Sequence, residues 1–207
     1  PGLAELVSGL IDAGRLAFDI SPNNAIPNAD AVFLAVGTPA LPDGDTDLSF
    51  IFSAADAAVS RMRDDAVLVI KSTVPAGTAR RVRQRAEKAR KGRSISVASN
   101  PEFLREGSAL SDFMAPDRVV IGADDAHAES LLRRLYRPLS RRAPVRVTST
   151  VNAELIKYAA NAFLALKIGF INDIADLCEA AGGDIRDVAD GIGLDRGIGP
   201  AFLQTGP

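Results

Sequence analysis

The sequence has very little of two residue types that often carry catalysis or cross-links. Its 207 residues include one cysteine, Cys178, and one histidine, His127. A single cysteine excludes a disulfide within the chain and is typical of a protein from a reducing compartment. A single histidine without a second ligand nearby argues against a histidine-based metal site and against a Ser-His-Asp triad. We therefore expect a cytoplasmic protein without a metal site.

Long apolar runs and an excess of positive charge are also missing. No run reaches the roughly 18 apolar residues that a membrane span needs. The formal net charge is −2, so no global basic field attracts nucleic acid. A basic segment at residues 80–93 has no aromatic side chains for base stacking, and a solvated helix face explains it better than a nucleic-acid site. Neither a membrane nor a nucleic acid is expected as a partner.

Apolar residues in the first part of the chain follow an alternating strand and helix pattern. Five short apolar runs predict strands at residues 31–36, 66–70, 95–98, 118–121 and 145–147, and a weaker one is possible at 16–20. Helices are predicted at residues 3–13, 49–62 and 79–91, the first with a buried apolar face. The alternation predicts an α/β fold, with a Rossmann-like, doubly wound parallel sheet over residues 1–147.

Residues 148–207 follow a different pattern. The segment 148–150 (Thr-Ser-Thr) offers side-chain oxygens for a helix N-cap, and only Gly169 interrupts the helical pattern before the glycine pair that begins at Gly182. Apolar residues cover more than one face of this long helix, so it must be buried on more than one side. One side can pack on the sheet domain and the other predicts a second subunit. We therefore expect a central helical dimerisation domain over residues 148–207.

Three predicted strands end in short polar loops that contain proline. Thr38, Thr73 and Glu102 lie in these loops. Because ligands of open α/β sheets sit beyond the carboxyl ends of the strands, we expect the three residues to converge on one place. Each threonine can either hold a water or cofactor group there or serve only as a turn residue.

Two pairs of residues four apart suggest acid–base or oxyanion chemistry. Glu102 and Glu106 face the same way if Pro101 starts a helical turn, and one carboxylate can then act as a general acid or base. The same pair can also do no more than favour a helix N-terminus. Lys157 and Asn161 share one face of the long helix, where they can stabilise a developing alkoxide.

The lysine of the second pair has another interpretation. Lys157 can form an ion pair with Glu154 while its aliphatic stem covers apolar surface. Spacing alone does not choose between this structural role and a catalytic one.

Taken together, the motifs resemble those of the UDP-glucose 6-dehydrogenases, within the UDP-glucose/GDP-mannose dehydrogenase family. The resemblance runs along essentially the whole chain. It is carried by residues 36–39 (Val-Gly-Thr-Pro), 71–75 (Lys-Ser-Thr-Val-Pro), 100–107 (Asn-Pro-Glu-Phe-Leu-Arg-Glu-Gly), 117–122 (Asp-Arg-Val-Val-Ile-Gly) and 157–164 (Lys-Tyr-Ala-Ala-Asn-Ala-Phe-Leu).

The resemblance implies NAD-dependent oxidation of UDP-glucose to UDP-glucuronate in polysaccharide biosynthesis, through a cysteine thiohemiacetal and thioester, by a homodimer. It implies a catalytic set in which one carboxylate assists hydrolysis, two groups stabilise oxyanions and one hydroxyl holds water: Glu102, Lys157, Asn161 and Thr73, respectively. It places at the cofactor Gly37, Thr38, Pro39, Ser72 and Glu106. It places at the substrate Phe103, Leu104 and Arg196.

The sequence also departs from the family pattern. The resemblance implies a Gly-rich cofactor loop before Pro1 and a nucleophilic cysteine in a motif that would begin at Gly206-Pro207. As the sequence stands, we expect weak nucleotide binding and no turnover. Arg196 stands one residue before the place of the family's substrate-binding arginine. Two alternatives stay open: a dehydrogenase of another nucleotide sugar, such as GDP-mannose or a UDP-amino sugar, and a non-catalytic dimerisation fragment.

Overall fold

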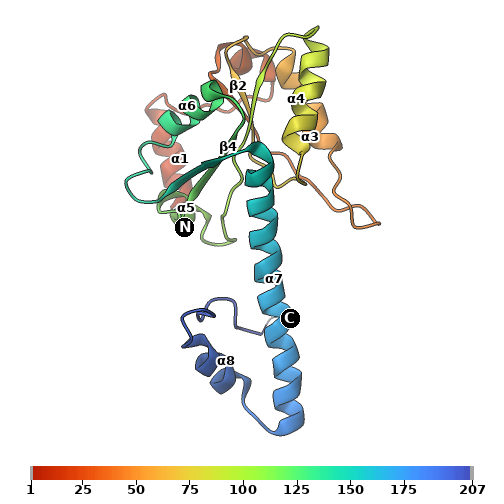
Figure 1. Ribbon diagram of the computed structural model, residues 1–207. Coiled ribbons are helices and arrows are strands. Elements are labelled where there is room, and N and C mark those ends of the chain that lie inside the picture. The colour runs from red at the N-terminus through yellow and green to blue at the C-terminus, as the bar shows by residue number, and fades with distance from the viewer. Residues whose placement is uncertain (1, 206–207) are drawn as a thin grey trace. The chain divides into compact units, whose positions relative to one another are not determined.

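The computed structural model describes residues 2–205 (Figure 1). The positions expected for the Gly-rich loop, before Pro1, and for the cysteine motif, from Gly206-Pro207, lie outside the described residues. The chain separates into two compact units, one up to Lys157 and one from Tyr158 on. The helices and strands are α1 (Leu3–Asp12), α2 (Pro22–Ala25), the 3-10 helix η1 (Ile26–Asn28), β1 (Ala31–Leu34), α3 (Ser49–Val59), β2 (Val67–Ile70), α4 (Thr78–Ala89), β3 (Ser96–Ser99), α5 (Ala109–Met114), β4 (Val119–Ala123), α6 (Ala126–Leu135), β5 (Val145–Thr148), α7 (Thr150–Ala181) and α8 (Ile185–Gly193).

The first unit is built on a 5-stranded sheet with the strand order β1-β2-β3-β4-β5. β1, β2 and β3 are parallel to one another, and β4 is parallel to β5. The expected α/β, Rossmann-like fold is confirmed, but the sheet is not parallel throughout, because β3 and β4 pair antiparallel at Ser99 and Gly122. The connection between them carries only α5, which buries no residue. A parallel pair needs a crossover packed on one face of the sheet, and this connection provides none.

Helices cover both faces of the sheet. Figure 1 shows α3 and α4 on one side and α6 on the other. In α3 the buried residues Ile51, Ala55, Ala58 and Val59 recur at helical spacing, as the sequence predicts. All four residues of β2 are buried because helices lie over both of its faces. The buried apolar side chains form two clusters, which include residues of β1, β2 and β3.

Two expectations for the N-terminal residues are wrong. Residues 16–20 form no strand. The apolar stripe of α1 forms the predicted helix but is not buried, since Leu3 is 59% exposed and Ile11 45% exposed. Helical spacing predicts which residues share a face, whereas burial requires a partner surface, and nothing within residues 2–205 supplies one for this face.

The long predicted helix, α7, is confirmed at both ends. Ser149 Oγ accepts a hydrogen bond of 3.2 Å from the backbone N–H of Asn152, which caps the start of the helix. Gly182, with a φ of 75°, follows its last residue and adopts the left-handed conformation that favours glycine. Within the second unit the Cys178 side chain is buried beside Gly183.

Candidate functional site

Two polar loops meet where β1 and β2 end. Thr38 Oγ1 donates a 2.9 Å hydrogen bond to the carbonyl of Thr73. Ser72 Oγ donates one of 2.6 Å to the carbonyl of Val36. These bonds join residues far apart in sequence because parallel strands bring their carboxyl ends to the same edge of the sheet. Of the three residues expected to converge, Thr38 and Thr73 therefore meet here.

The loop after β3 brings Glu102 to Lys157 of α7. Lys157 Nζ lies 3.4 Å from Glu102 Oε1, and the lysine side chain is only 7% exposed. The other carboxylate oxygen accepts a 2.6 Å hydrogen bond from the backbone N–H of Leu104. The ring of Phe103 lies under two cations, with Arg118 4.0 Å and Lys157 5.2 Å from its centroid. A carboxylate and a nearly buried ammonium group are thus held together at the edge of the sheet.

Two expectations about these charged residues are wrong. Residues 101–105 are not helical, and α5 begins only at Ala109, so Glu102 and Glu106 do not share a helix face. Lys157 does not pair with Glu154 either. Glu154 accepts hydrogen bonds of 2.6 Å from the N–H of Gly77 and 2.7 Å from that of Ala79.

Glu154 therefore serves the N-terminus of α4. Its carboxylate binds two backbone N–H groups that the helix itself leaves without partners. The side chain is 2% exposed. Burial raises the pKa of Glu154, and the two amide hydrogen bonds act against that rise. This residue fixes the start of α7 against α4 and so supports the placement of Lys157 one turn later.

Asn100 is a buried centre of hydrogen bonds that the sequence did not reveal as part of the site. Its Nδ2 donates to the carbonyl of Val120 at 2.7 Å. Its Oδ1 accepts from Tyr136 Oη at 2.5 Å and from Lys71 Nζ at 3.2 Å. Lys71 and Asn100 each directly follow a strand, and that position was a usable signal. The contribution of Tyr136, from the end of α6, had no signal in the sequence.

The polar centre shifts two ionisation equilibria. Burial lowers the pKa of Lys71 to about 8, with the charge of Glu102 raising it and that of Lys157 lowering it. Burial raises the pKa of Tyr136 to about 12, so its hydroxyl stays a hydrogen-bond donor at neutral pH. Lys71 thus changes charge closer to neutral pH than an ordinary lysine does.

A separate ion pair, Arg105–Asp112, stabilises the loop that carries Phe103 and Leu104. Asp112 of α5 accepts hydrogen bonds from the Arg105 backbone N–H at 2.9 Å and from its Nη2 at 2.7 Å. It also accepts one of 3.2 Å from Ser108 Oγ. The hydrogen bonds from Arg105 hold the pKa of Asp112 below its usual range. Leu104 stays 37% exposed at this loop, where a ligand can reach it.

Comparison with known proteins decides the family. Residues 1–140 match the model of the UDP-glucose/GDP-mannose dehydrogenase family, NAD binding domain, and residues 151–207 match that of its central domain. The chain belongs to this family. It is similar to the UDP-glucose 6-dehydrogenase of Rickettsia conorii, with 48% identity over 99% of this chain and 47% of that protein. It is equally similar to TuaD, a UDP-glucose 6-dehydrogenase of Bacillus subtilis, with 48% identity over 100% of this chain and 44% of the relative.

Solved structures from the family share the fold. A UDP-glucose dehydrogenase from Pyrobaculum islandicum matches with a TM-score of 0.94 and 45% identity, covering 100% of this chain and 48% of its own. A GDP-mannose dehydrogenase from Pseudomonas aeruginosa matches with a TM-score of 0.88 and 35% identity, over 94% of this chain and 46% of its own. The chain therefore spans about half the length of these relatives.

The residues expected at the cofactor fit an NAD-binding member of the family. Gly37, Pro39 and Glu106 are exposed on the loops that follow β1 and β3. A Cβ built on Gly37 meets no heavy atom within 4 Å, so the loop leaves open space beside its backbone. Thr38 and Ser72 are partly buried and still have oxygen lone pairs for a ligand.

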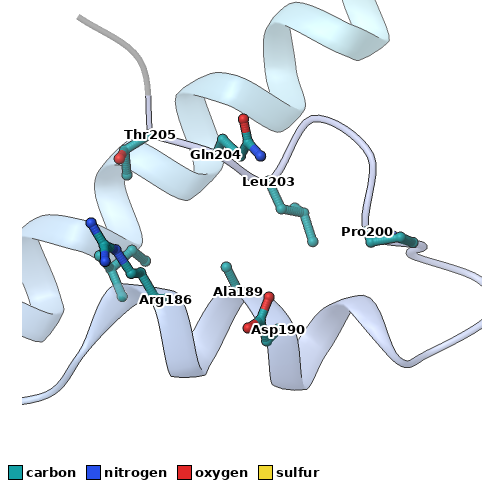
Figure 2. Close-up of a pocket in the computed structure, with 8 residues that line it drawn as sticks. Arg186, Ala189, Asp190, Pro200, Leu203, Gln204 and Thr205 are labelled. Carbon is teal, nitrogen blue, oxygen red and sulfur yellow. The ribbon is translucent and has the colours of Figure 1, made fainter.

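Two expected site residues belong to the second unit. Asn161 lies four residues after Lys157 on α7 and is exposed, as is Arg196 in the turn after α8. A hollow of about 420 Å³ lies between α8 and the segment that follows it (Figure 2). Its lining consists of Ile185, Arg186, Ala189, Asp190, Pro200, Leu203, Gln204 and Thr205. Arg196 is not one of these residues, so the hollow gives it no substrate-binding geometry.

Residues 2–205 contain neither a candidate metal site nor a candidate membrane-spanning helix. Among them, no three His, Cys, Asp or Glu side chains are grouped so that they can hold a metal ion. In the same range, no helix has the length and apolar character to cross a bilayer.

Proposed function

We propose that the full-length protein oxidises the C6 hydroxyl of UDP-glucose to a carboxylate, producing UDP-glucuronate and reducing two NAD. The observation that carries the proposal is the Lys157–Glu102 pair at the carboxyl edge of the sheet. The 45–48% identity to proteins named UDP-glucose dehydrogenases supports the choice of substrate. The proposed setting is polysaccharide biosynthesis in the cytoplasm.

The chain's own side chains suit the charge changes of this reaction. The ammonium of Lys157, nearly buried, stabilises negative charge that develops on the oxygen of the reacting carbon. Oxyanion stabilisation is also assigned to Asn161, which belongs to the second unit. Glu102 accepts a proton from the water that attacks in the last step, and Thr73 holds that water.

The cofactor contacts and two of the three substrate contacts are assigned to loops of the first unit. The residues proposed to line the cofactor are Gly37, Thr38, Pro39, Ser72 and Glu106. Bound there, NAD would supply the hydride acceptor. The substrate contacts proposed are Phe103, Leu104 and Arg196. In this assignment residues 1–147 form the NAD-binding domain and residues 148–207 the helical dimerisation domain.

Oxidation of the alcohol to a carboxylate removes four electrons as two hydrides. The proposal includes a covalent step between the two hydride transfers. The first hydride transfer converts the alcohol to an aldehyde. A cysteine thiol adds to that aldehyde, and loss of a second hydride gives a thioester. Water then displaces the thiol and leaves the carboxylate. We assign this step to the cysteine of the motif that the family resemblance places from Gly206-Pro207 onward, and not to Cys178, whose thiol is buried beside Gly183.

The test measures NADH formation by the full-length protein with UDP-glucose, GDP-mannose and UDP-N-acetylmannosamine. UDP-glucose should give the highest initial rate. Lys157→Ala should lower kcat by about 10²–10³-fold, the usual cost of losing one oxyanion-stabilising group. Glu102→Gln should slow release of the carboxylate product. Lys88→Ala, at an exposed position of α4, is the control and should leave the rate unchanged.

Three other results would count against the proposal. No NADH from any nucleotide sugar removes the enzymatic function. A higher rate with GDP-mannose or the amino sugar supports a dehydrogenase of that sugar. Full activity in both Lys157→Ala and Glu102→Gln would mean that this pair has only a structural role and takes no part in catalysis.

We also propose a homodimer formed through α7. Within the second unit, large apolar side chains of this helix are exposed: Phe163 62%, Leu166 67%, Phe170 50% and Leu177 63%. A helix with apolar residues on more than one face needs cover on more than one side. Light scattering on the full-length protein should give the mass of a dimer, and Leu166→Asp should shift it towards the monomer. Glu179→Gln, an exposed polar position on α7, is the matched control.

A further inference from the structure

Lys71 is an ammonium group in the site that has no assigned role. It directly follows β2, and its Nζ donates a 3.2 Å hydrogen bond to Asn100 Oδ1. It interacts electrostatically with both Glu102 and Lys157. Lys157 forms the ion pair with Glu102, and the charge of Lys71 acts on both residues without an ion pair of its own. The three groups together carry an excess of positive charge when both lysines are protonated.

The position of Lys71 is fixed by its partner. Asn100 is 1% exposed, and its backbone N–H donates to the carbonyl of Ile70 at 2.8 Å. Its side-chain amide is held from the other side by Val120 and Tyr136. Turning the amide over would set its oxygen against the Val120 carbonyl and its NH2 group against the Lys71 ammonium, so its oxygen stays directed to Lys71. A flexible lysine at the surface would not need an acceptor held in this way.

We propose that Lys71 is a positioning residue of the active site, whose ammonium, held by Asn100, sets the charge beside Glu102 and Lys157 for an oxyanion that forms there. The catalytic consequence rests on the proposed function, whereas the place of Lys71 in the charge cluster does not. Lys71 acts through its neighbours and is not proposed to touch the reacting atoms.

Burial makes the charge of Lys71 sensitive to pH, and two charged neighbours modify its pKa. The charged groups that act on it are Glu102 on the loop after β3 and Lys157 on α7; the neutral Tyr136 hydroxyl, from the end of α6, reaches it through Asn100. Burial brings the pKa of Lys71 to about 8. Raising the pH through this value removes one positive charge from the site.

The first experiment measures the titration of Lys71 without any need for activity. The full-length protein reacts with a trace of acetic anhydride at a series of pH values, and mass spectrometry gives the labelling of each lysine peptide. A free lysine peptide of pKa about 10.4 is the internal standard. Partial burial slows the labelling of Lys71 at every pH but does not move its midpoint. The midpoint should lie near pH 8.

Two variants test the cluster in opposite directions. Glu102→Gln removes an attraction that favours the ammonium, so the midpoint of Lys71 should fall. Lys157→Met removes a repulsion, so the midpoint should rise. A midpoint equal to that of the standard, or one that neither variant moves, overturns the proposal regardless of activity.

The second experiment follows kcat and KM against pH for wild type, Lys71→Arg and Lys71→Gln. Wild-type kcat should decline above pH 8, whereas Lys71→Arg should keep its rate there because guanidinium stays protonated. Lys71→Gln should lose about tenfold in kcat at neutral pH, less than removal of a direct oxyanion donor, and should lack the decline.

The outcomes separate the two proposals. Parallel pH profiles in all three proteins, with only stability changed, mean a structural role for Lys71 and overturn the inference. A wild-type protein that forms no NADH from nucleotide sugars overturns the proposed function. In that case the labelling shifts still decide whether Lys71 belongs to the cluster.

Discussion

Lys157 Nζ lies 3.4 Å from Glu102 Oε1 and joins the long helix α7 to the loop after β3. One member of the pair is buried and the other is partly exposed, since the side chain of Lys157 is 7% exposed and that of Glu102 is 33% exposed. In such surroundings the attraction exceeds that of a surface pair, while part of the desolvation cost is avoided. The contact is therefore expected to contribute to stability as well as to the site.

A double-mutant cycle on the free energy of unfolding measures this contact. Lys157→Met and Glu102→Gln, alone and together, should give a favourable coupling of about 1 kcal/mol. The exposed i, i+4 pair Arg133–Glu129, at 2.7 Å, is the matched control and should couple by only a few tenths, about 0.3–0.5 kcal/mol. Equal coupling in the two cycles would show that partial burial adds nothing at Lys157.

Glu154→Gln should destabilise the protein by about 1–3 kcal/mol, measured by urea unfolding at neutral pH. The carboxylate accepts from both Gly77 and Ala79, whereas an amide side chain presents one acceptor and one donor to the two N–H groups. Glu179→Gln on the same helix is exposed and should change little.

The same residue gives a pH signature. The pKa of Glu154 is raised in the folded protein, so the folded state holds this proton more tightly than the unfolded state. The part of its contribution to stability that depends on the bound proton is therefore fully present below the unfolded pKa of 4.5 and is lost as pH rises through the higher folded value. Glu154→Gln should lack this loss of stability. If wild type and Glu154→Gln had the same stability at every pH, the raised pKa would not belong to Glu154.

Gly122→Ala should destabilise the protein by about 1–3 kcal/mol through overpacking. A Cβ at this position of β4 would lie 2.6 Å from Ala153 Cβ and 2.9 Å from Thr150 Cα. The start of α7 therefore packs directly on the backbone of the strand. Gly9→Ala in α1, where a Cβ meets nothing within 4 Å, should instead stabilise by up to about 1 kcal/mol. Thermal unfolding of both variants should show a lower melting temperature for Gly122→Ala and a higher one for Gly9→Ala.

The stability of wild type relative to Lys71→Met should increase between pH 8 and pH 10. The folded pKa of Lys71 is about 8 and its ordinary value is 10.5, so the unfolded state binds more protons in this window and stability rises with pH. The gain across the window is on the order of 2 kcal/mol. The difference between the two proteins at each pH cancels the titration of other groups. A constant difference would mean that Lys71 titrates at its ordinary pKa.

Local patterns predicted much of the first unit. The uninterrupted apolar run of β2, the helical spacing of α3 and the capped start of α7 all follow from residues close in sequence, and each is found as expected. The meeting of Thr38 and Thr73 also followed, because parallel strands place their carboxyl ends at one edge.

Other features depended on contacts between distant residues. The antiparallel β3–β4 pair depends on α5 failing to pack on the sheet, and the exposed stripe of α1 depends on the absence of a partner surface within residues 2–205. Helical spacing alone offered Glu154 as a partner for Lys157. The backbone N–H groups that Glu154 binds instead come from the start of α4, far away in the sequence.

By itself, the sequence determined the α/β class, the long helix and the polar loops after three strands, because burial periodicity and capping act over a few residues. Only the tertiary structure decided the partners of the charged side chains. The energy of a buried charge depends on which groups surround it in space. Lys157 therefore pairs with Glu102. Lys71 is held by Asn100, which also accepts from the buried hydroxyl of Tyr136, and interacts with the pair through its charge.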